Sequence, residues 1–136
     1  MSSDIRQVVE AAYDARRRNN LADIMPLLGD EPGYRLAGGT SLGILSAGVR
    51  GLAVMRETLA DLIGTWDWTG MVSRVVAAEG ETVIVHCAGT MRFVPTDTSF
   101  ATELLDMVTV RDGKVVEVVE FADTQKVSEL IRAAQR

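Results

Sequence analysis

The segment that decides the fold is FATELLDMVTVRDGKVVEVVEFADTQKVSELI, residues 100–131. Two runs rich in β-branched residues flank Asp112-Gly113, and a short amphipathic stretch follows them. Such runs around an Asp-Gly pair are typical of a β-hairpin, and the amphipathic stretch predicts a closing helix. Four acids interrupt the apolar runs: Glu103, Asp106, Glu117 and Glu120. An ionised carboxylate is costly to bury, so any of them that points inward is a candidate for chemistry or recognition.

The length of the turn decides which acids share a face of the hairpin. A two-residue loop at Asp112-Gly113 places Asp106 and Glu120 on opposite faces, because successive side chains of a strand alternate. A three-residue loop that ends in a left-handed Gly113 puts both acids on one face, as diagonal neighbours with Cα atoms roughly 7–8 Å apart. We favour the three-residue loop, because the shorter turn requires a positive φ at Asp112.

In the three-residue register, Val110 lies opposite Lys114. One face of the hairpin then collects Phe100, Thr102, Leu104, Asp106, Val108, Val116, Val118, Glu120 and Ala122. This face is apolar apart from two acids and a threonine, and we interpret it as the wall of an internal pocket. The apolar residues of the opposite face are Ala101, Leu105, Met107, Val115, Val119 and Phe121. They predict a homodimer that forms through the outer face of the sheet.

Composition limits the class of protein. A length of 136 residues predicts one domain, residues 1–136, and 47% hydrophobic residues indicate a globular protein. The net charge of -5 argues against nucleic acid or an anionic membrane as partner. No run approaches the roughly 18 apolar residues of a membrane span. The single cysteine excludes an internal disulfide and predicts a cytoplasmic location.

Hydrophobic periodicity predicts helices first and strands later. The first helix ends near Asn19-Asn20, and we interpret Arg16-Arg17-Arg18 as its solvated end. Pro26 limits a second helix to a few turns. There follow a short strand at 33–37, a mobile Gly- and Ser-rich connection at 38–48, a helix at 49–63, and strands at 68–77, 81–93, 99–110 and 115–122. This order predicts an α+β fold, in which a curled antiparallel sheet forms a cone around the N-terminal and inserted helices.

A cone of this kind leaves an apolar hollow between the sheet and the long helix. Asp106 and Glu120 are the candidate acid-base pair, and Tyr34 and Tyr13 are candidate hydrogen-bond donors to a ligand oxygen. The other expected ligand-binding residues are Met55, Leu59, Trp68, Met91, Phe100, Leu104 and Val118. His86 falls on the outward parity of its strand, and one histidine with one cysteine predicts neither a metal site nor a metal cofactor.

The chain resembles the nuclear transport factor 2-like superfamily, in its SnoaL-like or limonene-epoxide-hydrolase-like branch. Three segments carry the resemblance: VVEAAYDARRRNNLADIMPLL at 8–28, VTVRDGKVV at 108–116 and VVEFAD at 118–123. The order of predicted elements agrees with the superfamily over essentially the whole chain. The resemblance therefore implies the cone-shaped fold and an internal site for a small molecule.

The resemblance also suggests residue roles. It places Glu120 at the catalytic aspartate of limonene-epoxide hydrolase, Asp123 at its second aspartate and Tyr34 at its water-holding tyrosine. The Arg-x-Asp pair of that enzyme falls on Cys87 and Gly89, and the asparagine two residues after its tyrosine falls on Leu36. The hydrolase triad is therefore not carried over to this chain.

These observations predict a protein that binds a small, largely apolar molecule, such as a polyketide, terpenoid or steroid-like compound. If it is an enzyme, we expect isomerisation, cyclisation, dehydration or hydrolysis without a cofactor. Glu120 or Asp106 would be the base, and Tyr34 would polarise an oxygen. The alternative is a non-catalytic ligand-binding or dimerisation module on the same fold.

Overall fold

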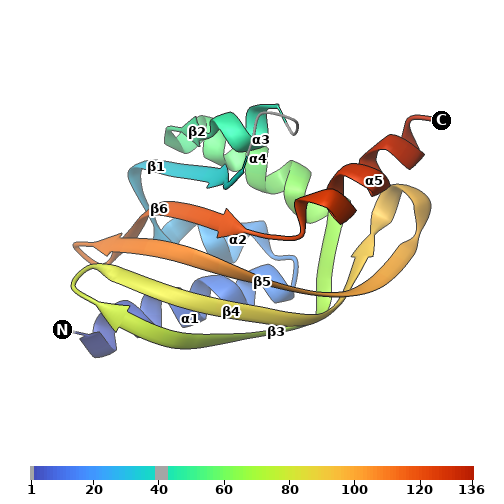
Figure 1. Cartoon of the computed structure of the whole chain (residues 1–136). Helices are drawn as coiled ribbons and strands as arrows, with labels where there is room; N and C mark the ends of the chain where they lie inside the picture. Colours follow the sequence, from blue (N-terminus) through green and yellow to red (C-terminus); the bar gives the residue numbers. More distant parts are fainter. Residues whose placement is uncertain (1, 39–42) are drawn as a thin grey trace.

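The computed structural model describes residues 2–38 and 43–136 of the chain. Its first part contains α1 (Ser2–Arg17), α2 (Leu21–Ile24), the 3-10 turn η1 (Met25–Leu27), β1 (Leu28–Leu36), α3 (Ile44–Ala47), β2 (Val49–Arg50) and α4 (Leu52–Thr65). Its second part contains β3 (Trp66–Glu79), β4 (Thr82–Phe93), the 3-10 turn η3 (Val94–Thr96), β5 (Thr98–Arg111), β6 (Lys114–Phe121) and α5 (Thr124–Ala134) (Figure 1).

The predicted α+β fold is confirmed, with local differences in the first half. Part of the Gly- and Ser-rich connection predicted at 38–48 lies outside the described residues, and α3 occupies its second half. The inserted helix begins at Leu52, because Val49–Arg50 pairs with β1 as a short strand. None of the described helices is long and apolar enough to cross a membrane.

Six strands form one curled, open sheet in the order β2-β1-β6-β5-β4-β3. Neighbouring strands are antiparallel except for β1 and β6, which run parallel. The prediction of a purely antiparallel sheet was therefore wrong at this pair. Parallel neighbours need a long crossover connection, and here the connection contains α4 and the other long strands.

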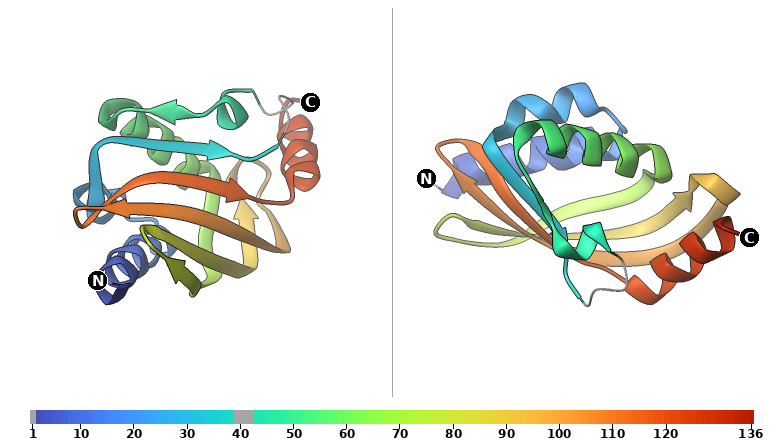
Figure 2. Two further views of the ribbon diagram at one scale, coloured as in Figure 1. Left: turned by 60° about the vertical axis from the view of Figure 1, so that its left-hand side comes forward. Right: turned by 90° about the horizontal axis from the view of Figure 1, so that it is seen from above.

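A close approach of two glycines bends the sheet. Gly89 has a φ of +141°, and a Cβ at this position would lie 2.3 Å from the carbonyl oxygen of Gly70. The register between β3 and β4 shifts between Asp67 and Gly70, which marks a bulge beside this contact. Bulges and glycines allow long strands to turn sharply. Figure 2 shows the resulting curve, with α1 and α4 on its concave side.

The β5–β6 hairpin differs from the predicted register. Asp112 and Gly113 both have positive φ, 53° and 76°, and Arg111 pairs directly with Lys114. The loop therefore has two residues, and the prediction of a three-residue loop was wrong. Asp is one of the few residues other than glycine that tolerates the left-handed region, which makes this primed turn accessible.

A bulge at Val116, three residues after Gly113, returns the acids to a common face. Val110 pairs with Val115, whereas Thr109 pairs with Glu117, so Val116 is an extra residue on β6. This shift places Asp106 directly opposite Glu120. The two-residue turn pairs Val115 with the inward Val110, so Val115 also points inward and is buried, which corrects our assignment of Val115 to the outer face.

The core lies between the concave face of the sheet and the helices. Val9 and Tyr13 of α1, together with Met55 and Leu59 of α4, are buried in one cluster with the inward residues of the long strands. These helical residues recur at intervals of four, so one face of each helix is apolar and packs against the sheet. The helices thereby form one wall of the hollow, and β5 and β6 form another.

Candidate functional site

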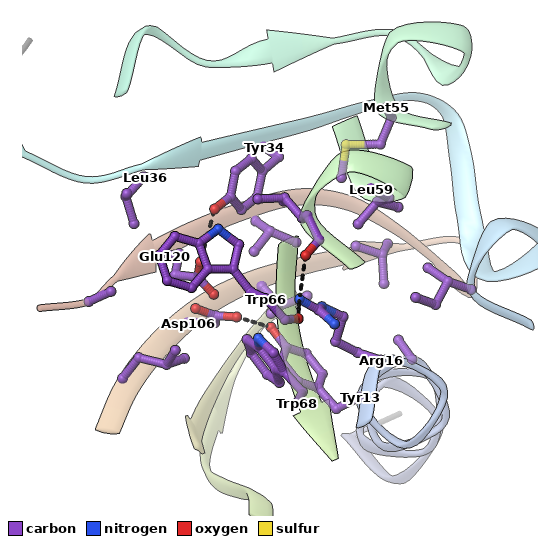
Figure 3. A pocket seen from close by; sticks show the side chains of 18 of the residues that line it. Tyr13, Arg16, Tyr34, Leu36, Met55, Leu59, Trp66, Trp68, Asp106 and Glu120 are labelled. Carbon is purple, nitrogen blue, oxygen red and sulfur yellow. Dashed lines mark hydrogen bonds between the residues drawn. The ribbon is translucent and has the colours of Figure 1, made fainter. Parts of the chain in front are cut away.

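A cavity of about 130 Å³ lies inside the cone. Most of its wall is aliphatic or aromatic, and side chains from both helices and the sheet contribute to it (Figure 3). Ten of the residues that the sequence suggested line it: Tyr13, Tyr34, Met55, Leu59, Trp68, Met91, Leu104, Asp106, Val118 and Glu120. Phe100 stands apart from this wall, since its ring packs edge-on against Trp66, with 6.4 Å between ring centroids.

Two carboxyl groups meet in the apolar cavity. Asp106 of β5 and Glu120 of β6 are directly opposed cross-strand neighbours, closer than the diagonal arrangement expected from the sequence. Asp106 is only 3% exposed, whereas Glu120 is partly buried. The bulge at Val116 is the local feature that brings these side chains to the same side of the sheet.

Each acid accepts a hydrogen bond from a tyrosine. The Tyr13 hydroxyl of α1 donates to Asp106 Oδ2, and the Tyr34 hydroxyl of β1 donates to Glu120 Oε1 over 2.9 Å. Both tyrosines are buried, and burial together with the neighbouring carboxyls raises the pKa of each well above 10. Their hydroxyls therefore remain protonated donors. The four side chains form one polar group on a wall that, apart from Arg16, is otherwise apolar (Figure 3).

Burial is the main cause that raises the pKa of Asp106 well above its ordinary value of 3.8, and the Glu120 carboxyl adds to it. The hydrogen bond from Tyr13 and the charge of Arg16 oppose this rise. The other oxygen of the Asp106 carboxyl, Oδ1, is buried and has no hydrogen-bond partner among the described residues. Asp106 therefore keeps its proton at pH values where an exposed aspartate is ionised.

Arg16 was expected at a solvated helix end, and this expectation was wrong. The residue is 9% exposed and lines the cavity. Its guanidinium donates to the carbonyl oxygens of Leu62 (3.3 Å) and Trp66 (2.9 Å), and it lies 4.7 Å from the ring centroid of Trp68. Burial lowers its pKa to about 10. A sequence signal existed, because Arg16 follows Tyr13 by three residues and so continues the apolar face of α1.

Cys87 and His86 lie in surroundings that suit a structural role. Cys87 is fully buried, its Sγ lies 3.5 Å from Ser73 Oγ, and burial raises its pKa to about 12, so the thiol stays protonated. His86 lies toward the outer face, where its Nε2 is 2.8 Å from Glu103 Oε2. Within residues 2–38 and 43–136, no cluster of three or more His, Cys, Asp or Glu side chains is arranged to hold a metal ion.

A comparison with protein families finds a match over most of the chain. A family model described as the SnoaL-like domain matches residues 9–118, which include the second half of α1, the inserted helix α4 and most of the sheet. A search of curated proteins gives no significant sequence match.

Solved structures share the fold at low sequence identity. TerC, co-crystallised with polyporic acid, has a TM-score of 0.78 and 21% identity, and the alignment covers 95% of this chain and 98% of TerC. An NTF2-like protein from Burkholderia xenovorans LB400 gives 0.74 and 21%, covering 93% and 95%. An LEH-like epoxide hydrolase of M. tuberculosis gives 0.69 and 18%, covering 96% and 91%.

Proposed function

The chain belongs to the SnoaL-like domain family, and on that premise we propose that it binds a small, largely apolar molecule in its cavity and transfers a proton on it. The aliphatic and aromatic lining supports an apolar ligand. A cavity of about 150 Å³ can take up benzene, so the present volume suits a compact ligand or ring of similar size. The co-crystal of TerC with polyporic acid supports the use of this fold for an organic ligand.

The observation that carries the proposal is the opposed pair of carboxyls in an apolar cavity. Glu120 is the base: its carboxylate takes a proton from a carbon that lies between a carbonyl and a C=C bond. The C–H electron pair forms a new C=C bond, and the carbonyl π pair moves onto the oxygen. The protonated Asp106 donates a hydrogen bond to that oxygen as its negative charge grows. Glu120 then returns the proton to a different carbon, which completes an isomerisation with no cofactor.

The tyrosines orient this pair. Tyr34 donates to Glu120 and Tyr13 donates to Asp106, so each acid has a fixed rotamer before a ligand enters. We expected Tyr34 to polarise the ligand oxygen. Its hydrogen bond to Glu120 instead supports a role in holding the base, and the neutral Asp106 is the better donor to the ligand.

The test is proton exchange on simple cyclic ketones, beginning with cyclohex-2-enone. Wild-type protein in D₂O should accelerate deuterium incorporation next to the carbonyl, as followed by ¹H NMR. Glu120→Gln retains an acceptor for Tyr34 but is not a base, so the enzyme-catalysed rate should fall by roughly 10²–10⁴-fold. Glu117→Gln is the matched control, since Glu117 lies on the same strand and binds Arg50 at 2.8 Å outside the cavity.

Two results would contradict catalysis by this pair. One is an exchange rate in wild type equal to that of buffer, and the other is an unchanged rate in Glu120→Gln. If a hydrophobic compound co-purifies in native mass spectrometry but no exchange occurs, the chain is a ligand-binding module. The apolar majority of the cavity lining is the observation that favours this second function.

The assembly and location are part of the same proposal. Leu105, Met107 and Phe121 are each at least 41% exposed on the outer face of the sheet, which supports a two-fold homodimer through that face. Nucleic acid is not a proposed partner, given the net charge of -5. The single cysteine is buried as a free thiol, which agrees with the expected cytoplasmic location.

A further inference from the structure

The buried guanidinium of Arg16 has not been given a role by the proton transfer described above. Its recorded hydrogen bonds go to neutral oxygens only: the carbonyls of Leu62 and Trp66, and Asn19 Oδ1 at 3.2 Å. Among the described residues, its nitrogens have no carboxylate within ion-pair distance. A guanidinium that is only 9% exposed and has no carboxylate in contact with it is costly to bury, so its retention calls for a reason.

The guanidinium is anchored where α4 ends and β3 begins. Leu62 lies in the last turn of α4 and Trp66 is the first residue of β3, so the two hydrogen bonds join these elements to α1. The Trp68 ring packs against the planar group at 4.7 Å. These contacts hold the cation in one orientation at the cavity wall. It lines the same cavity as Glu120 and does not form a contact ion pair with it.

The titratable groups in and around the acid pair come from α1 and from five strands of the sheet. They are Tyr13 and Arg16 on α1, Tyr34 on β1, Asp67 on β3, Cys87 on β4, Asp106 on β5 and Glu120 on β6. The two tyrosines and the cysteine are neutral, because burial raises the pKa of each. Asp67 is held by Asn19, Thr69 and Arg92, and these hydrogen bonds lower its pKa. Arg16 is therefore the cation of this group.

Resting on the proposed function, we propose that Arg16 is a positioning residue whose anchored charge keeps Glu120 ionised as the base and leaves the shared proton on Asp106. A cation stabilises the ionised form of a carboxyl across a cavity of low polarity. The neutral form belongs to Asp106, which is the more buried of the two acids. The separation between the Arg16 guanidinium and the Glu120 carboxylate matters as well. A contact ion pair between them would make Glu120 a weaker base, because it would stabilise the carboxylate too strongly.

The inference is tested on ligand-free protein, so that it does not depend on any substrate. The side-chain carboxyl carbons of ¹³C-labelled Asp and Glu are followed by NMR from pH 3 to 10, with Asp106→Asn and Glu120→Gln for assignment. Arg16→Met removes the charge, and the pH midpoint at which the pair loses its shared proton should rise by about one unit or more. Arg16→Lys keeps the positive charge, so the pH midpoint of this variant should stay within about 0.3 unit of the wild-type midpoint.

The matched control is Arg17→Met. Arg17 is the next residue on α1 and forms an exposed pair with Asp14 at 2.9 Å, so its loss should leave the midpoint unchanged. Should Arg16→Met fail to fold, Arg16→Gln replaces it, because Gln is uncharged and can still donate to the carbonyl of Trp66. The expected rise in the midpoint is the same.

The outcomes separate this inference from the proposed function. A merely structural Arg16 predicts lower thermal stability in Arg16→Met and Arg16→Gln, with the wild-type midpoint retained, and this result would overturn the role in charge. A charge-dependent midpoint supports the role even if no ketone exchange is found. A third outcome combines loss of exchange in Glu120→Gln with an unshifted midpoint in the Arg16 variants. It would support Glu120 as the base and refute the inference about Arg16.

Discussion

Asp106 links the burial of a single residue to a measurable property of the whole protein. Its carboxyl is almost fully buried, beside Glu120 and under the hydroxyl of Tyr13. Burial raises the pKa of Asp106 in the folded state. The unfolded chain ionises this group at a pKa of about 3.9. Asp106 thus favours folding below that value, and its contribution is lost as the pH rises from there toward the folded pKa.

Asp106→Asn should remove this pH dependence. The amide imitates the protonated acid: its oxygen can accept from Tyr13, and its nitrogen can donate to Glu120. The free energy of unfolding at pH 7 should be unchanged or higher than in wild type. The free energy of unfolding of the variant, relative to that of wild type, should increase by about 1 kcal/mol or more between pH 5 and pH 7.5, since one pKa unit corresponds to about 1.4 kcal/mol. Urea denaturation at both pH values measures this difference.

The opposite result has a clear meaning. If Asp106→Asn is less stable than wild type by a margin that is constant between the two pH values, then Asp106 is ionised in the folded protein. The shared proton would then be absent, and the acid assigned to the catalytic pair would be lost with it. Glu79→Gln, at an exposed site at the end of β3, provides the reference for an ordinary change from acid to amide.

At the scale of elements, the β5–β6 hairpin shows how a turn and a bulge act together. The two-residue turn alone would send Asp106 and Glu120 to opposite faces, and the extra residue Val116 brings them back together. The turn depends on two consecutive residues with positive φ. The position of the acid pair therefore depends on backbone geometry at both Gly113 and Val116.

Gly113→Val should destabilise the protein by roughly 1–2 kcal/mol, because a β-branched residue is strained at positive φ. The Cβ itself meets no atom within 4 Å at this glycine, so conformational strain is the expected cause. Thermal melts or urea titrations measure the loss. Asp112→Asn is the control: asparagine favours the same turn, so its stability should be equal to or slightly above that of wild type. Equal stability of Gly113→Val and wild type would contradict the primed turn.

At the scale of the whole molecule, the outer face of the sheet is as informative as the cavity. Leu105, Met107 and Phe121 are 42%, 41% and 49% exposed on adjacent strands. Val119 lies on the same face, opposite Met107, but is largely buried. The sheet thus separates two apolar surfaces, one for a ligand and one for a proposed second copy of the chain.

We predict a two-fold dimer at micromolar concentration, with a total buried area of at least roughly 1,200 Å². Leu105→Lys places a charge on this face and should convert the dimer to a monomer in sedimentation velocity experiments. Val54→Lys is the control, because Val54 is 42% exposed on α4, away from the outer face of the sheet, and should leave the dimer intact. A wild-type monomer would show that the exposed apolar face is not a dimer interface.

The sequence by itself determined the fold class and much of the cavity wall. Alternation along the strands and the four-residue spacing in α1 and α4 are local patterns, and each defines which side of its element is apolar. Met91 and Leu104 could therefore be assigned to the interior before their partners were known. The same parity placed His86 on the outer face, where the structure has it.

Only the tertiary structure decided the polar arrangement inside that wall. The bulge at Val116 had no local signal, because a run of valines fits either register. Tyr13 and Asp106 are 93 residues apart in the chain, so their hydrogen bond depends on the packing of α1 against the curled sheet. Arg16 is buried because the carbonyls of Leu62 and Trp66 meet it in the folded chain. The apolar pattern of an element depends on residues that are close in sequence, whereas the partners of a buried polar group depend on long-range packing.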